Sequence, residues 1–249
     1  MIICKSAAEL QKMRHSGRLV WQILRELGEM VQPGVTTQEL EHLAEKRIRE
    51  AGAHSAFKGY YGYPAVLCTS INHEIVHGIP SSQRVLKEGD ILKVDVGVEL
   101  NGYYGDTAFT FPVGRISPEL QRLLKVTQES LELAIQQARL GNRLGDICAA
   151  VQNHVEAHGY SVVRDFVGHG IGRKLHEDPQ VPNYGTAGQG PRLREGMVLA
   201  IEPMVNAGCS EARVLDDKWT AVTADGQCSA HFEHTVALTR DGPWILTQP

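Results

Sequence analysis

The sequence predicts a mixed α/β protein, of the α+β kind, in which helices precede β-strands twice along one chain. Apolar residues recur at helical spacing early in each half, and β-rich runs follow the helices each time. The order helix, helix, strands therefore occurs over about residues 1–115 and again over 116–249. Because no stretch resembles a linker, we expect one domain over 1–249, built from two pseudo-symmetric halves with a site at their junction.

Composition excludes several classes of protein. A net charge of −4 over 249 residues, without a basic cluster, gives no indication of specific nucleic-acid binding. No apolar run has the length of a membrane-spanning helix, and the first residues do not resemble a signal peptide. Five scattered cysteines without a Cys-x-x-Cys pair predict neither a disulfide framework nor a zinc ribbon, so we expect a cytoplasmic protein.

The first half begins with two helices that have capping boxes at their starts. Ser6–Glu9 and Thr36–Glu39 each place Ser or Thr three residues before Glu, ahead of apolar residues at helical spacing. Pro33-Gly34 ends the first helix, and Gly52 ends the second. A glycine- and tyrosine-rich loop follows, and then a short strand predicted over Ala65–Thr69.

The second half repeats this order. Ser117-Pro118 opens a helix with proline at its first position, and Glu119–Leu123 is similar to Glu9–Met13. The run 141–159 can be aligned with 34–52. Amphipathic helices often share such patterns, but the repeated order favours a duplicated unit.

Two β-rich runs between Ile91 and Phe111 are joined by Asn101-Gly102, a strong hairpin signal. This turn places Asp95 opposite Ala108 and Asp106 opposite Gly97, so that the two aspartates are diagonal neighbours on one face. Two carboxylates in an apolar sheet need a cation or a shared proton. An exposed, solvated edge is the alternative, and the valines around Asp95 argue against it. The hairpin therefore indicates a metal site.

Three further residues have similar surroundings. His169 lies between glycines, Glu202 ends an apolar strand, and Glu233 begins another. Alone, each would be a structural histidine, a capping carboxylate or an exposed charge. Together with the two aspartates they favour a metal centre: four carboxylates balance two divalent cations, and oxygen ligands with one imidazole suit Mn, Fe(II), Co or Zn. Two such metals can activate a water, which is hydrolase chemistry. The glycine-rich run around His169 lacks the spacing of a nucleotide-binding loop.

The ordered set Asp95, Asp106, His169, Glu202 and Glu233 resembles the metal ligands of the methionine aminopeptidases, in the pita-bread group that includes prolidase and aminopeptidase P. The surrounding motifs resemble the family too: Ile71-Asn72 with Val76–Pro80, Gly102–Thr107, Gly168–Gly172, Ile201–Asn206 and Glu233–Thr235. The resemblance runs from end to end of the chain. It implies a pita-bread fold, with duplicated helix-helix-strand units, a curved antiparallel sheet and a central dinuclear metal site.

The distances along the sequence between these residues distinguish among the members of the pita-bread group. Fewer than a hundred residues precede Asp95, too few for the extra domain of prolidase-like proteins. Only 25 residues separate His176 from Glu202, which leaves no room for the helical insertion of type II methionine aminopeptidases. The chain therefore resembles type I, and without an N-terminal extension it resembles the short bacterial form.

The resemblance implies removal of the initiator methionine from nascent polypeptides whose second residue is small. It implies that Asp95 binds one metal, that His169 and Glu202 complete the other, and that Asp106 and Glu233 bridge both. A metal-bridging water would attack the first peptide bond, with Glu202 as the proton carrier. His77 and His176 would contact the scissile amide and carbonyl, whereas His231 and His234 are expected to be structural.

The family match also places a methionine pocket around Tyr60, Tyr63, Cys68, His77 and Trp219. Two positions depart from the pattern: Phe57 stands where a small residue or cysteine is common, and Leu175 where phenylalanine is expected. These changes can offset each other in volume, so we expect methionine selectivity to be retained.

Two alternatives remain open at this stage. One is an X-Pro aminopeptidase of the same fold, and the other is a non-catalytic pita-bread module that binds ribosomes or histones. The partners expected for the enzyme are the N-termini of nascent polypeptides. A monomer without membrane contact is expected, ribosome association is left open, and the sequence does not say which metal is used.

Overall fold

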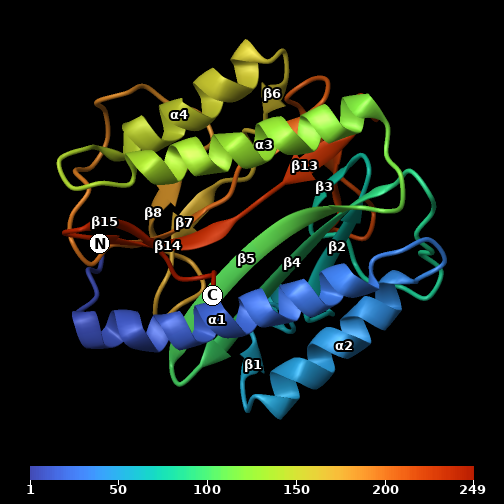
Figure 1. The fold of residues 1–249 in the computed structure, drawn as a ribbon, viewed down its shortest axis with the longest axis horizontal. Helices are drawn as coiled ribbons and strands as arrows, with labels where there is room; N and C mark the ends of the chain where they lie inside the picture. Colours follow the sequence, from blue (N-terminus) through green and yellow to red (C-terminus); the bar gives the residue numbers. More distant parts are fainter.

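Four α-helices cover one face of the strands, two on each half of the molecule (Figure 1). The computed structural model describes residues 1–249. The helices are α1 (Ala7–Met30), α2 (Thr37–Glu50), α3 (Pro118–Gln137) and α4 (Leu144–Ala157). In chain order, α1 and α2 lie on one side of the view and α3 and α4 on the other. No helix combines the length and the apolar character needed to cross a bilayer.

The predicted helix starts are confirmed. Ser6 and Thr36 are N-caps, and each forms the reciprocal hydrogen bonds of a capping box with the glutamate three residues later. Ser117 caps α3, and Pro118 takes the first position, where a missing N–H costs nothing. Helices α2 and α4 have 14 residues each. This equality agrees with a duplicated plan, but the single domain and the relation between the halves remain predictions.

The strands form four antiparallel sheets. The first contains β1 (His54–Ser55), β4 (Ile91–Leu100) and β2 (Leu67–Ile71), with β5 (Tyr103–Pro112) paired to β4; the second contains β13 (Ser229–His231), β10 (Met204–Asn206) and β6 (Ser161–Val162). The third contains β11 (Ala212–Val214), β12 (Ala221–Thr223) and β3 (Glu74–Val76); the fourth runs in the order β15 (Gly242–Ile245), β14 (His234–Thr239), β9 (Val198–Ile201), β7 (Gly168–Gly170) and β8 (Glu177–Val181). The loop before β2 contains one short 3₁₀ turn, Tyr60–Gly62.

The hairpin of β4 and β5 has the register that its turn predicts. Asp95 pairs with Ala108 and Asp106 pairs with Gly97, so both aspartates point to the same face. At the turn, Asn101 and Gly102 have φ values of 56° and 81°, as a two-residue hairpin loop requires. Position 102 therefore needs a residue that tolerates positive φ, and the register of both aspartates depends on it.

The short strand predicted over Ala65–Thr69 begins two residues later, at Leu67. The reason is a buried carboxylate on α2. The N–H groups of Val66 and Leu67 donate to the two oxygens of Glu41, at 2.7 Å and 2.9 Å. Because Glu41 accepts from the Val66 N–H, this amide is not available to a neighbouring strand, and β2 begins at the next residue.

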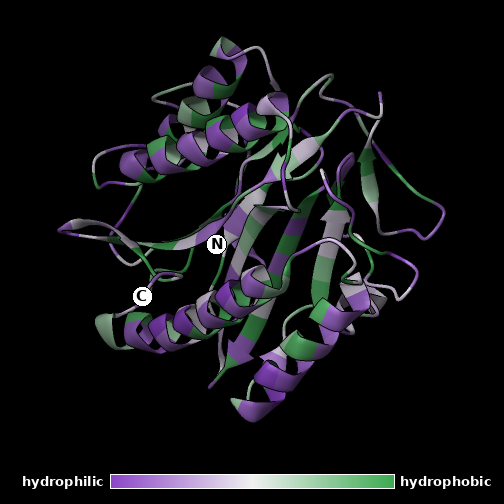
Figure 2. Cartoon of the chain, turned by 45° about the vertical axis from the view of Figure 1, so that its right-hand side comes forward, coloured by the Kyte–Doolittle hydropathy of each residue, from purple (hydrophilic) through white to green (hydrophobic).

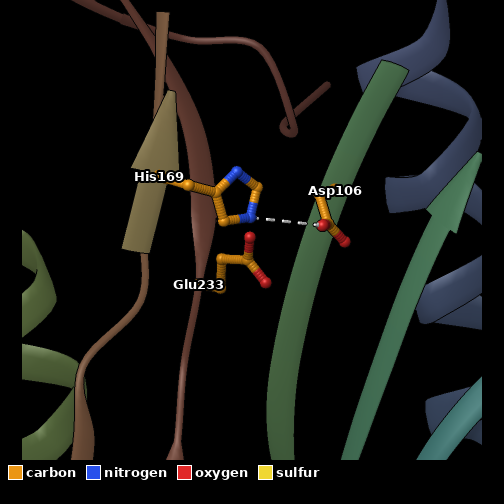
Figure 3. Close-up of side chains that lie close together, drawn as sticks. All are labelled: Asp106, His169 and Glu233. Atoms are coloured by element: carbon orange, nitrogen blue, oxygen red, sulfur yellow. Dashed lines mark ion pairs between the residues drawn. The ribbon is translucent and has the colours of Figure 1, made fainter. Parts of the chain in front are cut away.

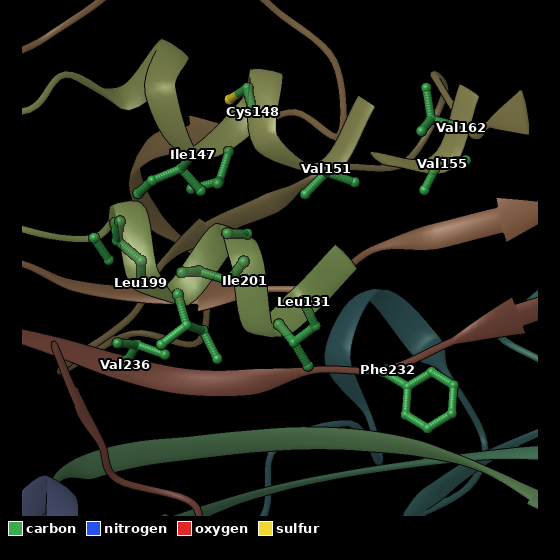
Figure 4. Close-up of a cluster of buried hydrophobic side chains, with 14 of the residues drawn as sticks. Leu131, Ile147, Cys148, Val151, Val155, Val162, Leu199, Ile201, Phe232 and Val236 are labelled. Carbon is green, nitrogen blue, oxygen red and sulfur yellow. The ribbon is translucent and has the colours of Figure 1, made fainter. Parts of the chain in front are cut away.

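The apolar core has one part under each pair of helices. Hydrophilic residues occupy the outward faces of the helices, and apolar residues face the strands (Figure 2). Under α3 and α4, Leu131, Ile147 and Val151 pack against Leu199 and Val236 of the fourth sheet (Figure 4). A second cluster lies between α1, α2 and the inner face of β4. Burial of both clusters holds the two halves of the strand layer in place.

A buried lysine joins segments that reach the site from different sheets. Lys93 lies on β4, on the same face as Asp95, and is only 1% exposed. Its ammonium group donates to the carbonyl oxygens of Asn72 at 2.7 Å and Ser229 at 2.9 Å. The start of β13 and the segment that leads to His77 are therefore fixed against β4.

Candidate metal centre

The five residues proposed as metal ligands line one cavity of about 280 Å³. Asp95 and Asp106 reach it from β4 and β5, and His169 from β7. Glu202 directly follows β9, and Glu233 lies between β13 and β14. The cavity therefore receives acidic side chains from the first sheet and from segments that flank strands of the second and fourth sheets.

Three of these side chains are especially close together (Figure 3). Ligand atoms of Asp106, His169 and Glu233 all lie within 4.8 Å of one another, and all three residues are buried. His169 Nε2 is 3.9 Å from Asp106 Oδ2 and 3.5 Å from Glu202 Oε1. One small ion could reach the ligand atoms of Asp106, His169 and Glu233 from a common position.

The backbone around His169 fixes which nitrogen faces the carboxylates. Nδ1 lies 2.9 Å from the carbonyl oxygen of Gly170, so Nδ1 carries the proton and Nε2 keeps its lone pair. A Cβ at Gly168 would lie 2.4 Å from Ala200 O, and one at Gly170 would lie 2.1 Å from Asp178 O. Glycine is needed on both sides because the neighbouring strands approach so closely.

The four carboxylates repel one another, and a bound cation would relieve this repulsion. Burial raises the pKa of Asp106 to about 7. Burial, with repulsion from the other acidic groups, also raises the pKa of Asp95, Glu202 and Glu233. One buried oxygen each of Asp95, Asp106 and Glu233 accepts no hydrogen bond. Buried carboxylate oxygens without hydrogen-bond donors, beside an available imidazole nitrogen, suit a divalent metal ion.

The two histidines predicted to contact substrate also line the cavity. His77 has φ +61°, a strained backbone conformation for a residue other than glycine, and its ring packs edge-on against Phe166 at 5.4 Å. Burial lowers the pKa of His77 to about 4. The His176 ring lies 4.2 Å from that of His169, and burial lowers its pKa as well. Both imidazoles are therefore neutral at pH 7.

The residues predicted for the methionine pocket lie at the same cavity: Tyr60, Tyr63, Cys68 and Trp219, together with Phe57 and Leu175. The Tyr63 hydroxyl donates to the carbonyl oxygens of Leu67 and Gly78, so its hydrogen-bonding capacity is satisfied by the backbone. Its ring meets Trp219 edge-on at 5.1 Å. This part of the cavity is apolar and close to the group of Asp106, His169 and Glu233.

Sequence reasoning did not single out some of the residues that line this cavity, among them Phe166 and Met204. His231, expected to be structural, lies behind Glu202: it is 1% exposed and places Nε2 3.7 Å from Glu202 Oε2. The alternation His231, Phe232, Glu233 could have indicated that the histidine and the glutamate share a face. No pattern in the sequence marked Phe166.

Comparisons with known proteins identify the family. The model of metallopeptidase family M24 matches residues 11–240. Over 248 residues the chain is 54% identical to methionine aminopeptidase 1 of Bacillus subtilis, covering 100% of both chains. The chain belongs to the methionine aminopeptidase family. The crystal structure of methionine aminopeptidase from Thermotoga maritima agrees, with a TM-score of 0.98, 48% identity and full coverage of both chains. The predicted pita-bread fold of this methionine aminopeptidase family member is thus confirmed.

The X-Pro alternative is not favoured. X-Pro aminopeptidase from Thermotoga maritima has a TM-score of 0.79 with this chain but only 22% identity, which shows the shared fold alone. The chain covers 63% of that protein, whereas it covers the whole of the methionine aminopeptidases compared above. Membership of a metallopeptidase family also agrees with a divalent metal at the acidic group in the cavity.

Proposed function

We propose that this protein removes the N-terminal methionine from polypeptides whose second residue is small, with divalent metal bound in the acidic cavity. The observation that supports this proposal most is a cluster of buried carboxylates and an imidazole that directly adjoins an apolar pocket of suitable size. Relatives that share 54% identity over the whole chain are named methionine aminopeptidases. The non-catalytic alternative would not need buried carboxylates without hydrogen-bond donors.

The residues that would hold the metal are Asp95, Asp106, His169, Glu202 and Glu233. Their four carboxylates balance two divalent cations, so we propose two ions; Co, Mn, Fe(II) and Zn all suit these ligands. When bound, the ions polarise the scissile carbonyl and lower the pKa of water. One oxygen each of Asp95, Asp106 and Glu233 accepts no hydrogen bond from the protein, which supports a metal as their partner.

The remaining steps belong to side chains of the protein. Glu202 has a raised pKa and lies near both His169 and His231, so we propose that it carries the proton from water to the leaving amine. His77 and His176 are neutral and can each donate one hydrogen bond, to the scissile amide region and to the carbonyl oxygen. We propose these contacts because both rings line the cavity beside the carboxylates.

Methionine selectivity would come from the apolar part of the cavity. Phe57 and Leu175 are both buried there with Cys68. Phe57 is larger than the residue expected at its position and Leu175 is smaller, so the two changes can offset each other in the volume of the pocket. The substrates we propose are the N-termini of nascent polypeptides, and we propose the cytoplasm, where such polypeptides are made, as the location of the enzyme. A monomer suffices for such a site, because one chain supplies all of the proposed residues.

One assay tests the proposal. Protein reconstituted with Co, Mn, Fe(II) or Zn is offered Met-Ala-Ser, Leu-Ala-Ser and Ala-Pro-Ala, with chelated protein as the control. We expect cleavage of Met-Ala-Ser, loss of activity on chelation, and at least about tenfold slower cleavage of Leu-Ala-Ser. Preferred cleavage of Ala-Pro-Ala would support the X-Pro alternative. Metal binding without cleavage of any peptide would support a binding module.

A further inference from the structure

A hydrogen bond crosses the cavity between two segments that are far apart in the sequence. The hydroxyl oxygen of Tyr60 lies 2.8 Å from Nδ1 of His176, and the two rings are 5.3 Å apart at an angle of 34°. No protein group forms a hydrogen bond with the other ring nitrogen, Nε2. His176 is thus held by one nitrogen, and the other is free for a ligand.

The turn that carries Tyr60 is fixed by its own backbone. Tyr60 N–H donates to Phe57 O at 2.9 Å, Tyr63 N–H to Tyr60 O at 3.0 Å, and Gly59 N–H to Tyr63 O at 2.8 Å. Gly59, Tyr61 and Gly62 have φ values of 89°, 48° and 89°. These bonds close a compact turn that places the Tyr60 hydroxyl beside His176. At the end of the turn, the side chain of Tyr63 is buried in the core.

The chemistry of the two groups fixes the direction of the hydrogen bond. A phenol is a stronger acid than a neutral imidazole N–H, and an imidazole nitrogen is a stronger acceptor than a phenol oxygen. Partial burial also raises the pKa of Tyr60, so its proton is retained at neutral pH. The bond is therefore O–H to Nδ1. A neutral imidazole that accepts at Nδ1 has its single N–H at Nε2.

We infer that Tyr60 is a positioning residue for the reaction: its hydroxyl holds His176 in the Nε2–H tautomer, so that the imidazole can donate a hydrogen bond to the substrate carbonyl. This inference rests on the proposed function of His176 and adds a second role to Tyr60 besides lining the pocket. This role differs from packing, because it depends on the hydroxyl group of Tyr60, whereas packing would depend on the ring alone.

The first test reads the tautomer directly. Protein labelled with ¹⁵N histidine, both metal-free and loaded with diamagnetic Zn²⁺, is measured by two-bond ¹H–¹⁵N correlation, and His176 is assigned from the spectrum of His176→Gln. We expect the Nε2–H tautomer in the native protein and a mixture of tautomers in Tyr60→Phe. The Nδ1–H tautomer in the native protein, or an unchanged ratio in Tyr60→Phe, would overturn the inference. This readout is independent of whether methionine peptides are cleaved.

The second test separates positioning from binding. With Met-Ala-Ser, Tyr60→Phe should lower kcat about tenfold and change KM less than about twofold, because one hydrogen bond is lost and the ring is kept. Tyr103→Phe is the matched control, since it removes a phenol that donates to Glu9 at 2.9 Å, outside the cavity. It should retain the native kcat. If Tyr60→Phe raised only KM, Tyr60 would act on substrate directly and the inference would be wrong.

A double-mutant cycle measures whether Tyr60 acts through His176. In the His176→Ala background, Tyr60→Phe should have no further effect on kcat, because the group on which Tyr60 acts is absent. The full tenfold effect in that background would contradict the inference. If the native protein cleaved none of the methionine peptides, the proposed function would fail, and the tautomer measurement would still decide the role of Tyr60.

Discussion

Glu202 lies between two imidazoles, with Oε1 3.5 Å from His169 Nε2 and Oε2 3.7 Å from His231 Nε2. We expect Glu202→Gln to lower kcat on Met-Ala-Ser at least about a hundredfold, because an amide cannot carry a proton. Steady-state kinetics measures the loss. Glu195→Gln is the control, since Glu195 is exposed and pairs only with Arg240. A Glu202→Gln enzyme with near-native kcat would exclude Glu202 as the proton carrier.

Metal content distinguishes the two neighbouring histidines. His169 offers Nε2 to the carboxylates, whereas His176 is bound through Nδ1 to Tyr60. We therefore expect His176→Ala to keep its metal and lose turnover, and His169→Ala to lose metal. Elemental analysis after dialysis measures both. Loss of metal from His176→Ala would show that it had been wrongly assigned as a non-ligand.

Local geometry made part of the site predictable. The positions of Asp95 and Asp106 follow from the hairpin turn alone, and the register in the structure is the predicted one. The distances from these aspartates to His169, Glu202 and Glu233 depend on how separate sheets pack, so only the family resemblance linked them. His231 was missed as a neighbour of Glu202 because its contact also depends on that packing.

At the scale of elements, Glu41 connects α2 to the start of β2. Glu41→Ala leaves two N–H groups without their acceptor and should lower the free energy of unfolding by about 2–4 kcal/mol. Urea denaturation of the metal-free protein measures the change. Glu45→Ala on the same helix should lower it by no more than about 1 kcal/mol, because Glu45 pairs with Lys58 at the surface. Equal effects of the two substitutions would contradict this explanation.

Helix starts were the most predictable elements, because capping depends on residues within one turn. Ser6, Thr36 and Ser117 cap their helices as predicted. The start of β2 was wrong because it depends on Glu41, which is distant in the sequence and satisfies the amides of Val66 and Leu67. Patterns of local residues cannot indicate such a contact.

For the whole molecule, the acidic cluster makes the stability of the metal-free form depend on pH. Burial raises the pKa of Asp106 from 3.8 to about 7. At Asp106 the folded state therefore binds more protons than the unfolded state in this range, and the stability that Asp106 contributes, which is full below pH 3.8, is lost as pH rises through about 7. Asp95, Glu202 and Glu233 shift in the same direction. Burial lowers the pKa of His77, His169, His231 and His234, so these histidines contribute in the opposite direction below about pH 6.5.

Thermal denaturation of the chelated and the reconstituted protein between pH 4 and 7 tests this expectation. The Tm of the chelated native protein minus that of chelated Asp106→Asn should fall as pH rises, because this difference isolates the contribution of Asp106 from that of the buried histidines. Added metal should raise the Tm of the native protein most near pH 7, because metal binds the deprotonated carboxylates. A difference independent of pH, together with a Tm unaffected by metal, would contradict a buried acidic site.

The positive φ of His77 affects which substitutions selection would favour at this position. Its φ of +61° costs about 1–3 kcal/mol for a residue with a side chain, and glycine or asparagine adopts that conformation more readily. A library screened only for thermal resistance would therefore tend to replace this histidine. A library screened only for growth on the enzyme's product would retain it. At position 77 the two screens should diverge, and their difference would show which residues are maintained for activity at the expense of the fold.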